Sequence, residues 1–345
     1  QNWVSKVGYF YLQNTVNEIV DTEVCLIIDE SIRVGREKLF LCLACPCEKL
    51  EQGDLPEEQI SVFYLKGSES WKGAEICCVL KEAIAKSGLS VRYILSDEGN
   101  NLIRAAHLLE IPHVADISHL VATCLKKTFQ NQEAYPAFSK TISKCQSKLA
   151  TGKYCYLRPP KQRVKARFLN QQKVVDWAEV ILDKWETLEE VVQQKLNPLI
   201  AHKEVITALK ESILLAKTLT LSLKMEGLSL QMITQMLKIV NKTIQKESVS
   251  ETLRVFANYL KEYLIKYQCF IIQQEWKGKS IHVCSDIIER LFGRYKAKVS
   301  DNYFVTTTTI ALELPLMCLS KEKLTQNIQV ALQKVKMTDL KDWRN

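Results

Sequence analysis

Short apolar runs alternate with amphipathic segments along the first 130 residues. The runs predict four buried strands and a short fifth one, at residues 24–31, 38–45, 60–66, 91–96 and 113–116. Helical spacing of apolar positions fills the later intervals, at residues 70–88, 100–110 and 117–129. Three strands followed by alternating helices and strands predict an α/β fold with a mixed sheet.

The pattern changes from about residue 141, where strand signals end. Residues 171–276 form one amphipathic helix after another, with Asn197-Pro198 and Gly227 as separators. The whole order outlines an RNase H-like mixed sheet flanked by helices and interrupted by an all-helical insertion domain. We expect an N-terminal extension (1–21), the first part of the core (22–140), a helical insertion with a basic segment at 157–168 (141–279), and the last part of the core with C-terminal helices (280–345).

Composition narrows the class of protein without deciding it. The chain has 345 residues, 47 Lys and Arg against 39 Asp and Glu, and a net charge of +8, which is compatible with a polyanionic partner. Its 12 cysteines are scattered, and most of them lie inside apolar runs, so we expect buried small hydrophobic residues in a reduced compartment. Walker, G-x-G-x-x-G, H-E-x-x-H and G-x-S-x-G motifs are absent.

The start of the chain and its apolar runs bear on location. No apolar run is long enough to span a bilayer, and QNWVSKVGYFYLQ lacks the layout of a signal peptide. The first residue is Gln rather than Met, so we expect an upstream segment. These features favour a cytoplasmic protein.

Three acidic residues stand in separate settings along the chain. Asp29 ends the run VCLIID, Asp97 ends VRYILSD, and Glu289 lies in the amphipathic segment SDIIERLFGRYK. Each taken alone has a simpler explanation, as a strand end or a solvated helix face. In an RNase H-like sheet, however, the first and fourth strands are neighbours. Asp29 and Asp97 would then be adjacent, and two like charges at that distance need a cation between them.

Carboxylate oxygens favour magnesium or manganese as that cation. Two such ions about 3.5–4 Å apart suit the in-line displacement of a phosphodiester. Water as the attacking group gives strand nicking, whereas a DNA 3′-hydroxyl gives strand transfer. Asp286 lies one turn before Glu289 and could also reach a metal.

Basic residues gather in the segment LRPPKQRVKARF. It contains five cations and no acid: Arg158, Lys161, Arg163, Lys165 and Arg167. Pro159-Pro160 prevents a helix, and an extended chain would project alternate cations to one side, toward a DNA backbone. A solvated loop is the alternative. Secondary candidates for DNA contact are Lys126, Lys127, Arg290, Arg294, Lys296 and Lys298.

Two further features have accessory roles in this interpretation. Asp116 and His119 in ADISHL have D-x-x-H spacing, but two ligands are too few for a metal site, so a structural hydrogen bond or a phosphate contact fits better. Trp177 and Trp185 fall on apolar helix faces and are expected in the core. Trp276 is less certain because Lys-Gly-Lys follows it.

Taken together, these blocks resemble a DDE transposase of a bacterial insertion sequence. IIDESIRVGREK is similar to the first aspartate block, ILSDEGNNLIRAA to the second, and SDIIERLFGRYK to the last, in which a glutamate precedes Arg and an apolar pair. ADISHL is similar to the C/D-x-x-H motif of hAT-like and Mutator-like transposases, and PPKQRVKARFLN to a block of related insertion-sequence enzymes. The resemblance implies that Asp29, Asp97 and Glu289 are catalytic. It favours Glu289 rather than Asp286 as the third acid. One departure is that no helix-turn-helix or zinc module is recognisable.

The expected function is therefore a metal-dependent DNA transposase core that cleaves and transfers strands at element ends. Two Mg²⁺ (or Mn²⁺) ions would be its cofactors. Its partners would be transposon-end and target DNA, with no membrane, and it would be associated with the nucleoid. We expect a homodimer or higher oligomer, since two element ends must be joined. Alternatives are an RNase H-like structure-specific nuclease, a non-catalytic DNA-binding protein derived from a transposase, and an unrelated helical interaction protein.

Overall fold

The computed structural model describes residues 2–14, 23–30, 37–130, 132–162, 171–299 and 309–344. The chain forms two compact units, which are described separately. The first unit combines Gln1–Asp116, Lys224–Gly227 and Lys279–Asn345, and the second combines Ile117–Leu223 and Leu228–Gly278. The second unit thus begins at Ile117, whereas the loss of strand signals placed a boundary near residue 141.

A five-stranded sheet forms the centre of the first unit. Its strands are β1 (Glu23–Glu30), β2 (Lys38–Pro46), β3 (Ser61–Ser68), β4 (Ser90–Ser96) and β5 (His113–Ala115). Their order is β3-β2-β1-β4-β5; β2 runs antiparallel to β1 and β3, whereas β1, β4 and β5 are parallel. This is the predicted RNase H-like mixed sheet, and the prediction of fold class is confirmed.

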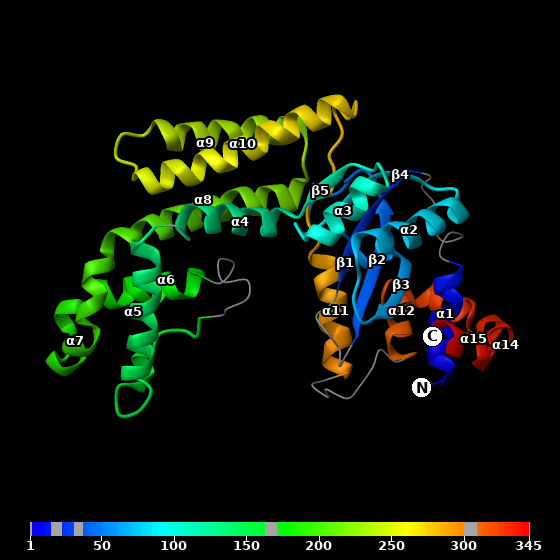
Figure 1. Ribbon diagram of the computed structural model, residues 1–345, viewed down its shortest axis with the longest axis horizontal. Helices are drawn as coiled ribbons and strands as arrows, with labels where there is room; N and C mark the ends of the chain where they lie inside the picture. Colours follow the sequence, from blue (N-terminus) through cyan, green and yellow to red (C-terminus); the bar gives the residue numbers. More distant parts are fainter. Residues whose placement is uncertain are drawn as a thin grey trace. The chain divides into compact units, whose positions relative to one another are not determined.

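Successive side chains of β1 point to opposite faces of the sheet, and the two faces pack against different helices. Val24, Leu26 and Ile28 share a fully buried core with α2 (Gly73–Ser87) and α3 (Asn100–Leu108). The helix α11 (Asp286–Val299) packs against β1, away from α2 and α3 (Figure 1). Residues 25, 27 and 29 of β1 therefore belong to the face opposite α2 and α3.

The remaining elements of the first unit form a helical cluster around α1 (Asn2–Gln13). Apart from η2 (Glu57–Gln59), which lies between β2 and β3 in the chain, they are η7 (Thr309–Glu313), α12 (Leu314–Met317), α13 (Lys321–Gln326), α14 (Ile328–Lys334) and α15 (Met337–Arg344). Val7 and Tyr11 of α1 pack with Ala331 of α14. The two ends of the chain therefore lie in the same cluster, as Figure 1 shows.

The regular elements of the second unit are helices over its described residues, as predicted for the insertion. Its elements are α4 (Ile117–Phe129), α5 (Ala134–Lys148), η3 (Cys155–Leu157), α6 (Gln171–Asp183), η5 (Trp185–Thr187), α7 (Glu190–Leu196), η6 (Asn197–His202), α8 (Lys203–Glu226), α9 (Leu230–Gln245) and α10 (Glu251–Gln273). Ser229 and Ser250 cap α9 and α10 by accepting from Met232 and Leu253 N–H groups. None of the helices in the described ranges is both long and apolar enough to cross a membrane.

A short extended segment returns the chain to the sheet before α11. Ile281 bridges Glu48, and the N–H of Lys49 donates to the Ser280 carbonyl at 2.8 Å. The N–H of His282 donates to the Tyr93 hydroxyl at 3.0 Å, and the imidazole is buried with 6% exposure. Burial, followed by the charge of Lys49, lowers the pKa of His282 to about 4. This segment sets where α11 begins.

His282 makes the stability of the protein depend on pH. The folded state keeps the imidazole neutral down to about pH 4, whereas the unfolded chain takes up a proton near pH 6.5. The free energy of unfolding should therefore fall by up to about 3 kcal/mol as pH drops from about 6.5 to about 4. Urea unfolding across this range should show a flatter profile for His282→Gln, and His107→Gln, at an exposed histidine, is the matched control. Parallel profiles for wild type and His282→Gln would contradict the assignment.

Candidate functional site

Asp29 and Asp97 lie at the carboxyl ends of the two central parallel strands. Ile27 of β1 is opposite Leu95 of β4, and each aspartate follows two residues later on its own chain segment. Since β1 and β4 are parallel, both carboxylates come to the same edge of the sheet. The register thus supports the adjacency that the sequence predicts for this pair.

Local hydrogen bonds orient both carboxylates. Asp29 Oδ1 accepts from the N–H of Glu30 at 2.7 Å, and Asp97 Oδ1 accepts from the N–H of Gly99 at 2.9 Å. A Cβ at position 99 would lie 2.8 Å from Asp97 Oδ1. A Cβ at position 99 would therefore push the Asp97 carboxylate out of its present position.

The helix α11 carries Glu289 on its exposed side. Ile288 and Leu291 are buried, while Glu289 is exposed. Burial lowers the pKa of Lys296, and the negative charges of Asp29 and Glu289 act in the opposite direction. Both carboxylates are therefore within electrostatic range of Lys296. This places Lys296, expected as a DNA contact, among the acidic residues.

The three acids are not gathered around one point. Over the described residues, Asp29, Asp97 and Glu289 do not form a group whose ligand atoms all lie within 4.8 Å of one another. Such a group is formed instead by Asp116, Cys284 and Asp286. Shared metal ligation by the first three residues would need their side chains to move together.

Asp116 connects the two elements that carry Asp97 and Glu289. Its carboxylate is buried, and Oδ2 accepts from both the N–H and the hydroxyl of Ser285 at 2.7 and 3.0 Å. Its own N–H donates to the carbonyl of Ser96, at the end of β4, at 2.7 Å. Because Ser285 directly precedes α11, Asp116 fixes the start of that helix relative to β4. The expectation of a structural hydrogen bond at Asp116 agrees with this contact.

A lysine already balances the charge beside Asp116. Lys224 Nζ lies 2.5 Å from Asp286 Oδ2. Burial raises the pKa of the Cys284 thiol to about 12, so this thiol is neutral beside the ion pair. The group formed by Asp116, Cys284 and Asp286 therefore fits an ion-pair cluster better than a metal site.

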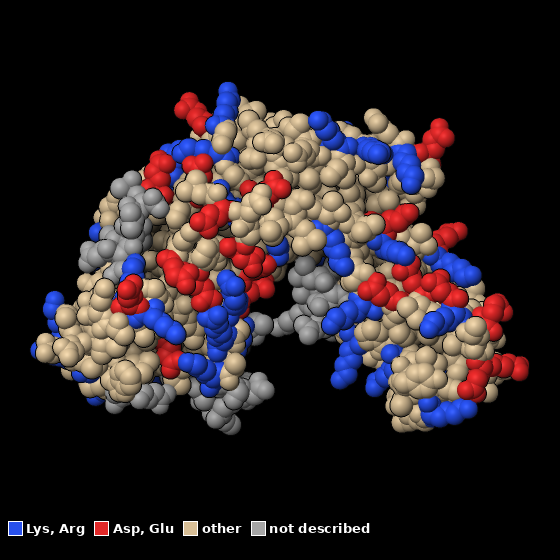
Figure 2. Space-filling view, turned by 180° about the vertical axis from the view of Figure 1, so that it is seen from behind, with Lys and Arg blue, Asp and Glu red and all other residues tan. Residues whose placement is uncertain are grey.

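Most of the other cations on α11 are engaged with acids. Arg294 binds both carboxylate oxygens of Glu57, at 2.9 and 3.0 Å, and Arg290 Nε is 3.6 Å from the same carboxylate. Lys298 pairs with Glu313. In the face drawn in Figure 2, Lys and Arg side chains are interspersed with acidic ones rather than gathered in one area. DNA contact by Arg290 or Arg294 would have to compete with Glu57.

The second unit holds the remaining candidates. Arg158 and Lys161 are exposed, whereas Arg163, Lys165 and Arg167 lie outside the described residues. His119 is half-buried in the first turn of α4, and Lys126 and Lys127 are exposed at its end. Trp276 is 3% exposed and stands edge-on to Phe270, with ring centroids 5.4 Å apart. Its ring is thus part of the helical core.

Three further residues position the site, namely Gly99, Ser285 and Lys224. Gly99 and Ser285 have local signals, since glycine after D-E and serine before D-I-I-E are typical of a turn and of a helix start. Lys224 has no signal in the nearby sequence, because its partner Asp286 is 62 residues away.

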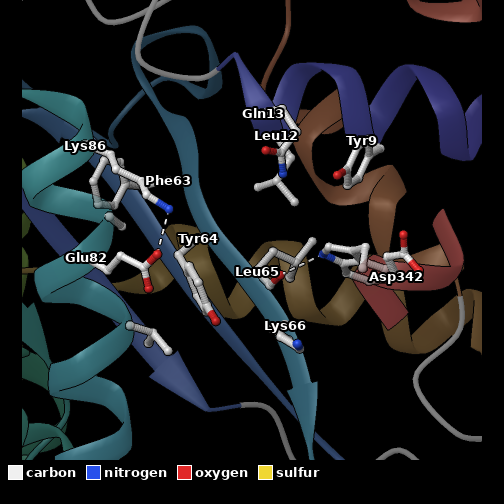
Figure 3. A pocket seen from close by; sticks show the side chains of 13 residues that line it. Tyr9, Leu12, Gln13, Phe63, Tyr64, Leu65, Lys66, Glu82, Lys86 and Asp342 are labelled. Atoms are coloured by element: carbon white, nitrogen blue, oxygen red, sulfur yellow. Dashed lines mark hydrogen bonds and ion pairs between the residues drawn. The ribbon is translucent and has the colours of Figure 1, made fainter. Parts of the chain in front are cut away.

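A separate cavity of about 440 Å³ lies against the edge strand β3 (Figure 3). Tyr9 of α1, Tyr64 of β3 and Trp343 of α15 contribute to its lining, and the indole N–H of Trp343 donates to the Leu65 carbonyl at 3.1 Å. Neither Asp29 nor Asp97 lines it. The cavity is therefore distinct from the acidic site.

Comparison with known proteins gives only distant structural similarity. No protein-family model matches the chain, and no curated protein matches it. Among solved structures, it is similar to the Drosophila P element transposase strand transfer complex, with a TM-score of 0.45 and 13% identity, covering 92% of this chain and 85% of that chain. No residue role is carried over at this distance, and the fold assignment rests on the strand order.

The two acids near Ser285 should differ sharply in their effect on stability. Asp116→Ala leaves the buried N–H and hydroxyl of Ser285 without their acceptor, and should lower the free energy of unfolding by about 2–4 kcal/mol. Asp286→Ala removes only a partly exposed ion pair with Lys224, and should cost about 1 kcal/mol or less. Urea unfolding measures both variants. Equal losses would refute the bridging role of Asp116.

Proposed function

We propose that this chain is the core of a metal-dependent DNA transposase of the DDE type, which cleaves DNA strands and transfers them at element ends. The observation that carries the proposal is the pairing of β1 with β4. It brings Asp29 and Asp97 to one edge of the sheet, with Glu289 on the helix that packs against β1. The resemblance of the sequence blocks to bacterial insertion-sequence enzymes supports it.

The donor set fits hard divalent cations. Asp29, Asp97 and Glu289 offer only carboxylate oxygens, the ligands that magnesium and manganese prefer. When bound, two such ions would activate the attacking oxygen and stabilise the leaving one. The repulsion between the two aspartates favours the uptake of positive charge at this edge. Asp29, Asp97 and Glu289 would hold the ions.

Neighbouring residues of the chain have supporting roles in this proposal. Gly99 lets the Asp97 carboxylate keep its hydrogen bond to the backbone. Asp116 holds the start of α11 through Ser285. Lys296, near Asp29 and Glu289, would neutralise a phosphate oxygen of the bound DNA.

DNA binding would rest on the basic segment of the second unit. Arg158 and Lys161 are exposed, and among the described residues neither forms an ion pair. Phosphate contacts from them, and from Arg163, Lys165 and Arg167, would give salt-dependent affinity. Transposition also needs two element ends together, so the proposal includes a homodimer or higher oligomer on DNA.

Metal binding and DNA cleavage test the proposal together. Calorimetric titration with Mn²⁺ should detect binding to wild type and its loss in Asp29→Asn and Asp97→Asn, while Asp183→Asn, an exposed acid of α6, stays unchanged. Nicking of a supercoiled plasmid in Mn²⁺ should fall by about 10²-fold or more in the same two variants, because they lose groups that stabilise developing charge. Equal Mn²⁺ binding in all four proteins would overturn the proposed site.

Reaction products separate transposase from nuclease. A labelled oligonucleotide with a free 3′-hydroxyl, incubated with plasmid and Mn²⁺, should become joined to the plasmid if the chain transfers strands. Nicked plasmid without joined product would point to an RNase H-like nuclease. DNA binding that is untouched by Asp29→Asn, with no nicking by wild type, would point to a non-catalytic binding protein.

Gly99→Ala should weaken metal binding without removing any carboxylate. The added Cβ would press on Asp97 Oδ1 and displace it, and loss of such a supporting contact costs about 10–100-fold in metal affinity. Gly293→Ala in α11 is the matched control, since no atom lies within 4 Å of its added Cβ. Mn²⁺ titration of both variants measures the effect. Unchanged affinity in Gly99→Ala would contradict the role of this turn.

A further inference from the structure

Residues 154–162 of the second unit form a loop whose backbone is held at several points. The anchoring contacts come from three different parts of the unit. The Tyr154 hydroxyl donates to Glu189 Oε2 at 2.6 Å, the Trp177 indole donates to the Leu157 carbonyl at 2.9 Å, and Gln162 Nε2 donates to the Ser139 carbonyl at 2.9 Å. Buried Pro159 adds a further fixed point. This part of the loop is therefore a defined surface.

Between these anchors, the loop presents an aromatic ring and two cations to solvent. Tyr156 is 75% exposed, and Arg158 and Lys161 are exposed as well. Among the described residues, none of the three forms a hydrogen bond or ion pair through its side chain. Tyr154 is the contrasting case, with 8% exposure and a bonded hydroxyl. We call Tyr156, Arg158 and Lys161 the Tyr156 patch.

The combination of groups in the Tyr156 patch indicates which ligand it fits. The two cations match phosphate groups, and the exposed ring offers a stacking face that an acidic peptide would not use. Bases in an intact duplex already stack on their neighbours, so only an unpaired base can use that face fully. An aromatic ring beside free cations is the combination by which proteins bind single strands.

We propose that the Tyr156 patch binds single-stranded nucleic acid, with a base stacked on Tyr156 and phosphates held by Arg158 and Lys161. This binding rests on and deepens the DNA contact already proposed for Arg158 and Lys161, and it uses neither the carboxylates nor a metal. It can therefore be tested in EDTA, and its failure would leave the proposal for the acidic site untouched.

The test measures the affinity of the full chain for a fluorescent oligothymidine of about 20 nucleotides, by anisotropy in EDTA. Tyr156→Ala should weaken binding by about 5- to 100-fold, the range for loss of one stacked base. Tyr156→Phe keeps the ring and should stay within about twofold of wild type, since stacking does not need the hydroxyl. A blunt duplex of the same length should lose less affinity than the single strand in Tyr156→Ala.

Two further variants complete the design. The double variant Arg158→Ala/Lys161→Ala should reduce the slope of log affinity against log salt by about 1.4, because each single-strand phosphate contact contributes about 0.7. Trp3→Ala, at a 56% exposed aromatic of the first unit, is the matched control and should bind like wild type. Thermal unfolding confirms that each variant folds. Wild-type affinity in Tyr156→Ala, or an equal loss in Tyr156→Phe, would overturn the proposal.

Discussion

The parallel pairing of β1 with β4 at the centre of the sheet is the constraint on which the site depends. It places two aspartates at one sheet edge. Nothing in strand packing requires acids there, since the buried residues before them already fill the core. The charges of Asp29 and Glu289 act on Lys296, and the Asp97 carboxylate accepts a hydrogen bond from the turn that follows it.

The second requirement is that α11 returns to β1 after a long excursion of the chain. Asp116 and Ser285 are 169 residues apart, yet they share two short hydrogen bonds in a buried setting. The extended segment before α11 adds the bridge between Glu48 and Ile281. Buried polar contacts of this kind are costly to break, which makes them suited to holding an element whose neighbours in sequence lie elsewhere. The position of Glu289 is thus set by residues that carry no catalytic chemistry.

Much of the fold could be predicted because its elements are locally encoded. The strand predicted at residues 24–31 is Glu23–Glu30 in the structure, and the helix predicted at 117–129 is Ile117–Phe129. The boundary between the two units could not be predicted in this way. The amphipathic faces of α4 and α5 show that these helices pack against something, but not against which unit. For the same reason, the pairing of Arg294 with Glu57, 237 residues away, has no signal in the sequence. The roles of Asp29, Asp97 and Glu289 stay predictions, although the sheet register supports the adjacency of the first two.

The most direct measurement is anomalous scattering from crystals of the full chain grown with Mn²⁺. The proposed site predicts two peaks among the carboxylates of Asp29, Asp97 and Glu289, about 3.5–4 Å apart. Peaks confined to the group formed by Asp116, Cys284 and Asp286, or no peak at the ends of β1 and β4, would contradict it.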